Sequence, residues 1–92
     1  MTSKTVTVVN QLGMHARAAA KFVHLAGRYA ARIRVSRQGR EVDGKSIMGI
    51  LLLAAARGSS VTISADGSDE HDAVDALAAL VASGFGEEPC GV

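Results

Sequence analysis

Polar and apolar residues alternate in three short segments of this chain. Residues 5–9, 32–36 and 60–65 alternate with a period of two, which is typical of a strand that buries one face. After the second segment, Gln38-Gly39 suits a tight turn, so residues 40–43 are predicted to form a fourth, short strand.

Apolar residues recur at helical spacing between these strands. A first helix is predicted from His15 or Ala16 to Ala26, with Gly27 or the residues just after it ending the helix. Its positions i, i+3, i+4 and i+7, which should face the core, hold Ala19, Phe22, Val23 and Ala26.

Two further helices are predicted. Residues 47–56 are strong helix formers preceded by Ser46. The last helix follows a cap at Ser68 or Asp69, carries acidic residues in its first turn and stops at Gly84. The resulting order is β-α-β-β-α-β-α.

This order predicts an α+β fold, because half-polar strands and amphipathic helices bury their apolar faces against each other in two layers. We expect an open-faced two-layer sandwich, with three helices on one face of a four-stranded, mostly antiparallel sheet. The 92 residues are enough for one small domain, taken to span 1–92. Aromatic residues make up only 3%, so the core should consist of aliphatic side chains.

The distribution of charge indicates which classes of partner this protein could bind. Residues 1–45 hold nine Lys and Arg against two acids, whereas residues 46–92 hold one Arg against seven acids. One part of the surface should therefore be basic enough to meet an acidic partner or a phosphate. Nucleic acid is not expected as a partner, because the total charge is only +1 and no recognition motif is present.

The compartment follows from the apolar runs and the cysteine count. The longest apolar stretch, 47–56, is half of the roughly 20 residues that span a bilayer, and no signal peptide precedes the first strand. The single Cys90 excludes a disulfide framework and a cysteine-rich zinc site. We expect a cytoplasmic protein with no membrane contact, no metal and no cofactor.

His15 is the first candidate for chemistry. It follows Gly13-Met14 at the start of a predicted helix, where unpaired N–H groups of Ala16, Arg17 and Ala18 form a ready anion site. The Arg17 guanidinium adds a forked donor suited to phosphate oxygens. An imidazole beside such a cradle can accept a phosphoryl group.

Two motifs resemble those of the HPr family. Residues 13–19, Gly-Met-His-Ala-Arg-Ala-Ala, resemble its active-site signature, and residues 44–50, Gly-Lys-Ser-Ile-Met-Gly-Ile, resemble its regulatory-serine motif. The interval between His15 and Ser46 and the final Ser-Gly-Phe-Gly-Glu-Glu also agree. HPr is the phosphocarrier of the bacterial phosphoenolpyruvate-dependent phosphotransferase system.

The resemblance implies roles for these residues. His15 would receive a phosphoryl group on Nδ1 from enzyme I and pass it to an EIIA domain, with Arg17 as the assisting cation. Ala18 stands where the family usually has proline. Unlike proline, Ala18 adds an N–H near the phosphate and leaves the loop less rigid. Because the nucleophile is present, we expect transfer to survive.

Ser46 carries two compatible interpretations. By itself it is a helix N-cap, a common structural use of serine. By resemblance it would be phosphorylated by an HPr kinase/phosphorylase, and the added dianion would change the sign of the nearby surface.

Partner docking is predicted on two helices. The helix after Ser46 is apolar on almost every side, so Ile47, Met48 and Leu51 are candidates for an exposed patch. A basic stripe on the first helix includes Lys21 and His24. A carrier with one docking face is most simply a monomer.

Three alternatives stay open at this stage. An acyl-phosphate hydrolase would need a residue that activates water, and near the His15 loop only Asn10 is available. A regulator acting through Ser46 alone would be expected to lack the histidine. A regulatory HPr paralogue of a nitrogen-type branch, acting mainly by protein binding, is the third.

Overall fold

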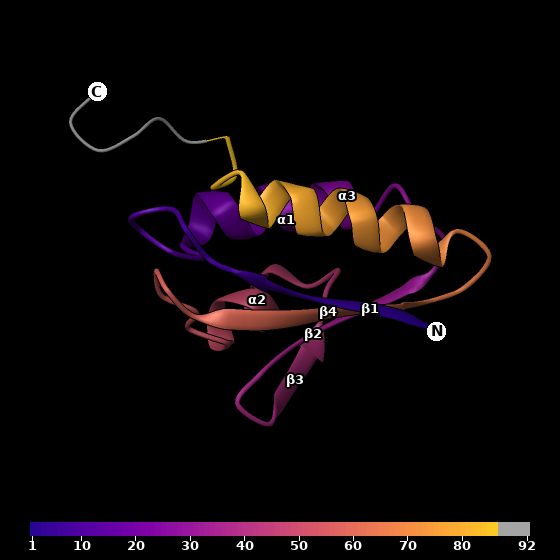
Figure 1. Cartoon of the computed structure of the whole chain (residues 1–92), viewed down its shortest axis with the longest axis horizontal. Coiled ribbons are helices and arrows are strands. Elements are labelled where there is room, and N and C mark those ends of the chain that lie inside the picture. The colour runs from indigo at the N-terminus through magenta and orange to yellow at the C-terminus, as the bar shows by residue number, and fades with distance from the viewer. Residues whose placement is uncertain (87–92) are drawn as a thin grey trace.

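The computed structural model describes residues 1–86 as a sheet covered by helices (Figure 1). The elements, in chain order, are β1 Thr2–Thr7, α1 Ala16–Ala26, β2 Arg32–Arg37, β3 Arg40–Asp43, α2 Ile47–Leu52, β4 Ser60–Asp66 and α3 Glu70–Ala82. Cys90, Glu87 and Glu88, on which part of the sequence argument rested, lie outside the described residues.

The four strands form one sheet in the order β1-β4-β2-β3, and every neighbouring pair is antiparallel. Arg37 lies opposite Arg40 across a two-residue hairpin, in which Gln38 and Gly39 both have positive φ, at 51° and 82°. α1 and α3 lie side by side over one face of the sheet, and α2 packs against α1 and β3 (Figure 1). The predicted α+β open-faced sandwich is confirmed.

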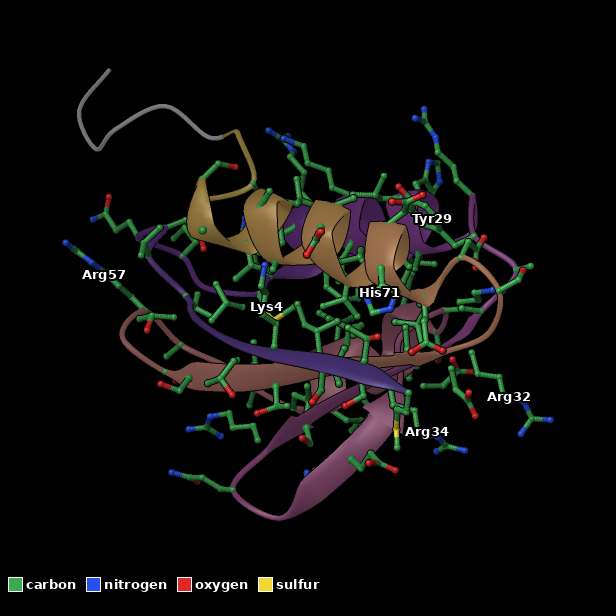
Figure 2. All side chains as sticks on the ribbon, turned by 45° about the vertical axis from the view of Figure 1, so that its right-hand side comes forward. Lys4, Tyr29, Arg32, Arg34, Arg57 and His71 are labelled. Atoms are coloured by element: carbon green, nitrogen blue, oxygen red, sulfur yellow. The ribbon has the colours of Figure 1, made fainter. Side chains whose placement is uncertain are left out.

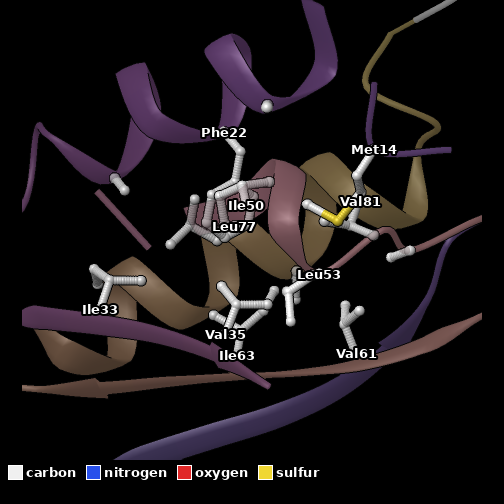
Figure 3. Close-up of a cluster of buried hydrophobic side chains, with 14 of the residues drawn as sticks. Met14, Phe22, Ile33, Val35, Ile50, Leu53, Val61, Ile63, Leu77 and Val81 are labelled. Atoms are coloured by element: carbon white, nitrogen blue, oxygen red, sulfur yellow. The ribbon is translucent and has the colours of Figure 1, made fainter. Parts of the chain in front are cut away.

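The core lies between the sheet and the helices. Alternate strand residues such as Val35 and Ile63 meet Phe22 of α1, Ile50 of α2 and Leu77 of α3 (Figure 3). Burial of these apolar side chains stabilises the fold by roughly 1.5–3 kcal/mol each. Within α1, the buried face is formed by Ala18, Ala19, Phe22 and Ala26. Val23, which the spacing also placed in the core, is only partly buried against it.

The first strand starts and ends earlier than its alternation predicted. It pairs with β4 from Thr2 opposite Ala65 to Thr7 opposite Ser60, so it ends where β4 begins. Val8 then leaves the ladder but keeps two backbone bonds to the turn before β4, to Ser59 and Gly58. The extent of its pairing with β4 therefore sets the ends of β1, and the alternation of residues in β1 does not contain that information.

The prediction of a helix over 47–56 is wrong in its second half. α2 ends at Leu52, and Ala54 adopts a left-handed conformation with φ 52°. The carbonyls of Leu52 and Leu53 accept hydrogen bonds from the side chains of Arg40 and Arg37, at 3.0 and 3.2 Å. These contacts from the β2–β3 hairpin occupy the carbonyls that end the helix.

α3 is tied to two other segments at its start. Asp69 takes the N-cap position, yet its carboxylate accepts the backbone N–H groups of Ala30 and Ala31 instead of capping α3, and these bonds lower its pKa. The Glu70 carboxylate accepts from the Thr2 hydroxyl and pairs with the Met1 amino group, and these contacts lower its pKa to about 2.

The sheet's other face carries polar and charged side chains. Figure 2 shows Arg32 and Arg34 projecting from this face, away from the helices, and Arg34 lies 3.4 Å from Glu41. No helix within residues 1–86 is long and apolar enough to cross a membrane.

Candidate functional site

The segment between β1 and α1 presents His15 at the start of a helix. His15 is the N-cap of α1, with extended backbone (φ −75°, ψ −178°), and its side chain is partly exposed. Its Nδ1 accepts the backbone N–H of Arg17 at 3.3 Å, a long hydrogen bond. The lone pair of Nδ1 therefore points at the positive end of the α1 dipole.

Residues 16–18 form the first turn of α1, as the sequence predicted. Ala16 and Arg17 are exposed, whereas Ala18 is completely buried. Since the first N–H groups of a helix have no acceptor within it, this turn can receive an anion. The Arg17 side chain lies at the surface beside the same turn.

The loop before His15 is anchored to the segment after α2. Met14 is buried, and its N–H donates to the Ala55 carbonyl at 2.9 Å. Gly13 has φ 66°, and a Cβ there would lie 2.6 Å from the same Ala55 oxygen. Only glycine fits both the conformation and the space. The glycine of the motif thus permits the close approach that fixes the loop.

Ser46 is the N-cap of α2. Its Oγ accepts the N–H of Gly49 at 3.0 Å, as expected of a capping serine. The His15 loop meets the chain beyond the other end of α2, at Ala55. The six residues of α2, about 9 Å of helix, together with Leu53 and Ala54 therefore lie between Ser46 and that contact.

The three residues of α2 that were predicted to form an exposed apolar patch do lie at the surface. Ile47, Met48 and Leu51 are 40%, 69% and 36% exposed, and Leu52 beside them is 60% exposed. We refer to Ile47, Met48 and Leu51 as the α2 patch. This patch lies on a helix that packs against α1, the helix that begins at His15.

The two remaining docking candidates lie further along α1. His24 is exposed in a shallow recess with Leu25, Arg28 and Leu80. Lys21 is exposed as well, but its Nζ donates to the carbonyl of Phe85 at 2.8 Å, so it links α1 to the turn after α3.

Three further residues lie in the loops and turns described above, and only Asn10 had an expected role from the sequence, as the one residue near the His15 loop that could activate water in a hydrolase. Asn10 is buried beneath the His15 loop, and Phe85 is buried with φ 61° in the turn after α3. Arg57, which projects at the surface in Figure 2, lies in the turn that receives Val8. Asparagine and glycine are both typical turn residues, so the spacing of Asn10 and Gly13 was the available signal. Within residues 1–86, no three His, Cys, Asp or Glu residues gather closely enough to hold a metal ion.

Comparison with known proteins is consistent with this geometry. The family model described as the PTS HPr component phosphorylation site matches residues 2–83. The phosphocarrier protein HPr of Cupriavidus necator is 53% identical over 87 residues, which cover 95% of this chain and 98% of that protein.

Solved structures agree. The crystal structure of HPr-C-His from Thermoanaerobacter tengcongensis superposes with a TM-score of 0.92 at 43% identity, covering 96% of this chain and 99% of that one. An HPr dimer from the same organism has a TM-score of 0.75 at 42% identity, covering 95% and 100% of the two chains.

Proposed function

This chain belongs to the HPr family of phosphocarriers of the phosphotransferase system, and we propose that His15 is the residue that carries the phosphoryl group. The observation that supports this assignment most strongly is the position of Nδ1, which faces the N-terminus of α1 beside Arg17. The donor is enzyme I, and the acceptor is an EIIA domain. The whole chain acts as one cytoplasmic domain that shuttles between them.

The transfer is a substitution at phosphorus. The lone pair of Nδ1 forms the new N–P bond while the bond between phosphorus and its donor atom on enzyme I breaks, and that donor atom keeps the electron pair. Transfer to EIIA reverses these roles. The protein ends each cycle unchanged, so it is a carrier and not an enzyme in the usual sense.

The start of α1 favours the phosphorylated state. A phosphoryl group on Nδ1 brings negative charge to the N–H groups of Ala16, Arg17 and Ala18, where the helix dipole is positive. Arg17 supplies a full positive charge at the same turn. Ala18 is buried, so the residue that replaces the family's proline contributes its Cβ to the core and leaves an N–H at the turn.

Docking involves the α2 patch together with basic groups of α1. Exposed Met48 and Ile47 offer adaptable apolar contact, Arg17 offers positive charge to an acidic partner, and the exposed His24 offers a hydrogen-bonding ring. Phosphorylation of Ser46 by an HPr kinase/phosphorylase would place a dianion directly beside this patch. We propose that it weakens docking of enzyme I. A monomeric carrier stays a prediction, because one related HPr is described as a dimer.

The test is incubation with phosphoenolpyruvate and enzyme I. The protein should gain one acid-labile, base-stable phosphoryl group, and His15→Ala should gain none while keeping its fold. His71→Ala serves as the matched control, because His71 is exposed and lies outside the docking residues, so this variant should be labelled normally. Labelling of His15→Ala would refute the assignment, and continuous release of phosphate would favour a hydrolase.

A further inference from the structure

Asn10 is the one polar side chain that the fold buries within residues 1–86, with 7% of its surface exposed. Buried polar groups require hydrogen bonds, so a buried amide specifies its surroundings more tightly than an apolar residue of the same size would. Asn10 lies in the loop that leads from β1 to His15.

Asn10 binds both polar groups of Gly13. Its backbone carbonyl accepts the Gly13 N–H at 3.1 Å, and its side-chain Nδ2 donates to the Gly13 carbonyl at 2.7 Å. The peptide that joins Gly13 to Met14 is therefore held at both ends. Asn10 holds its C=O, and the Ala55 carbonyl accepts its N–H.

This peptide orients the chain that enters α1. One residue beyond it, His15 has fixed extended backbone and aims Nδ1 at the Arg17 N–H. Rotation of the 13–14 peptide would turn His15 away from that N–H, because the intervening Met14 is anchored in the core.

The turn after α3 covers Asn10 on its outer side. A Cβ on Gly84 would lie 3.5 Å from the Asn10 Cβ, and Lys21 holds the carbonyl of the following residue, Phe85. Asn10 is thus enclosed by this chain and is not available to a docking protein.

From this arrangement we propose that Asn10 is a positioning residue for phosphoryl transfer, acting through the 13–14 peptide to hold Nδ1 of His15 at the start of α1. The inference rests on the proposed role of His15. A misplacement of about 1 Å at a reacting group can cost about 100-fold in rate. Loss of the Asn10 amide should therefore lower kcat by roughly tenfold or more, while KM, which reflects the untouched docking surface, stays within about twofold.

The experiment compares Asn10→Ala and Asn10→Asp with Asp69→Ala. The aspartate has the shape of asparagine but offers no donor to the Gly13 carbonyl at neutral pH. Asp69→Ala is the matched control, because it removes two hydrogen bonds to Ala30 and Ala31, beyond the opposite end of α1. Each variant is assayed with enzyme I at a temperature where circular dichroism shows it to be folded. A second assay uses phosphoramidate, a small donor that releases ammonia as the N–P bond forms.

The results separate this inference from the proposed function. Failure of the wild-type protein to accept phosphate from enzyme I would count against the proposed function, and the phosphoramidate rates would still test Asn10. Equal kcat values for the Asn10 variants and Asp69→Ala would overturn the positioning role. Hydrogen exchange on the wild-type protein needs no variant. The Met14 amide should be strongly protected, and exchange at the rate of an unfolded peptide would also overturn the proposal.

Discussion

Replacing Ser46 separates its capping role from its proposed regulatory role. The Ser46 Oγ accepts the Gly49 N–H at 3.0 Å, and the first turn of α2 has no acidic residue. Ser46→Ala removes this acceptor. Ser46→Asp retains one and adds a negative charge beside the α2 patch.

The expected changes in stability follow from these contacts. Loss of a serine N-cap costs about 1 kcal/mol, which corresponds to roughly 4–8 °C in Tm for a domain of this size. Aspartate caps about as well as serine, and a charge at a helix N-terminus adds about 0.3–1 kcal/mol. The carboxylate of Asp43, which accepts the Lys45 N–H at 2.9 Å, opposes that gain through repulsion. The stability of Ser46→Asp should therefore stay within about 0.5 kcal/mol of the wild-type value.

The assay pairs thermal unfolding with the rate of phosphorylation by enzyme I at low and high salt. Ser46→Ala should unfold earlier but accept phosphate at the wild-type rate. Ser46→Asp should be phosphorylated more slowly at low salt, because its charge must be desolvated and faces acidic groups on the partner. Its rate should recover at high salt, since the Debye length falls from about 10 Å at 0.1 M to about 3 Å at 1 M.

Three outcomes would refute parts of this reasoning. An unchanged Tm in Ser46→Ala would show that the bond to Gly49 does not stabilise α2. A wild-type phosphorylation rate for Ser46→Asp at low salt would mean that Ser46 is only a cap. A slow rate that salt leaves unchanged would exclude charge repulsion as the cause.

Three further predictions concern other parts of the molecule. Arg17→Ala should slow phosphorylation by less than the roughly 100-fold typical of a buried anion-binding donor, because Arg17 is exposed, and a loss as complete as that of His15→Ala would contradict this. The pKa of Glu70 is lowered from its ordinary value of 4.5 to about 2, so Glu70 stabilises the fold above pH 4.5 and this contribution is lost as the pH falls toward 2. Unfolding of the wild type and Glu70→Gln across that range should show a flatter pH dependence in the variant, and identical profiles would refute the assignment. Gly13→Ala should destabilise the domain and slow transfer, since its Cβ would meet the Ala55 carbonyl at 2.6 Å, and unchanged chemical denaturation and rate would show that the loop yields.

Short-range patterns in the sequence were sufficient for the order of elements and for the position of His15. Alternation reports which side of a strand is buried, and the 3.6-residue period does the same for a helix, so α1 and β2 were placed to within one residue. The prediction of Ser46 as the N-cap of α2 is confirmed for the same reason, because a cap acts within three residues of its own position.

Contacts between distant segments decided the rest. α2 stops at Leu52 because side chains from a hairpin and a left-handed Ala54 end it, although the Leu and Ala residues at 51–56 are good helix formers. Asp69 was one of two residues, with Ser68, expected to cap the last helix, yet its carboxylate accepts two N–H groups almost forty residues away. Sequence patterning alone determined that a histidine begins an amphipathic helix. Only the tertiary structure decided how its loop is held, because the hydrogen-bond partner of the Met14 N–H, the Ala55 carbonyl, is a backbone atom that no residue type announces.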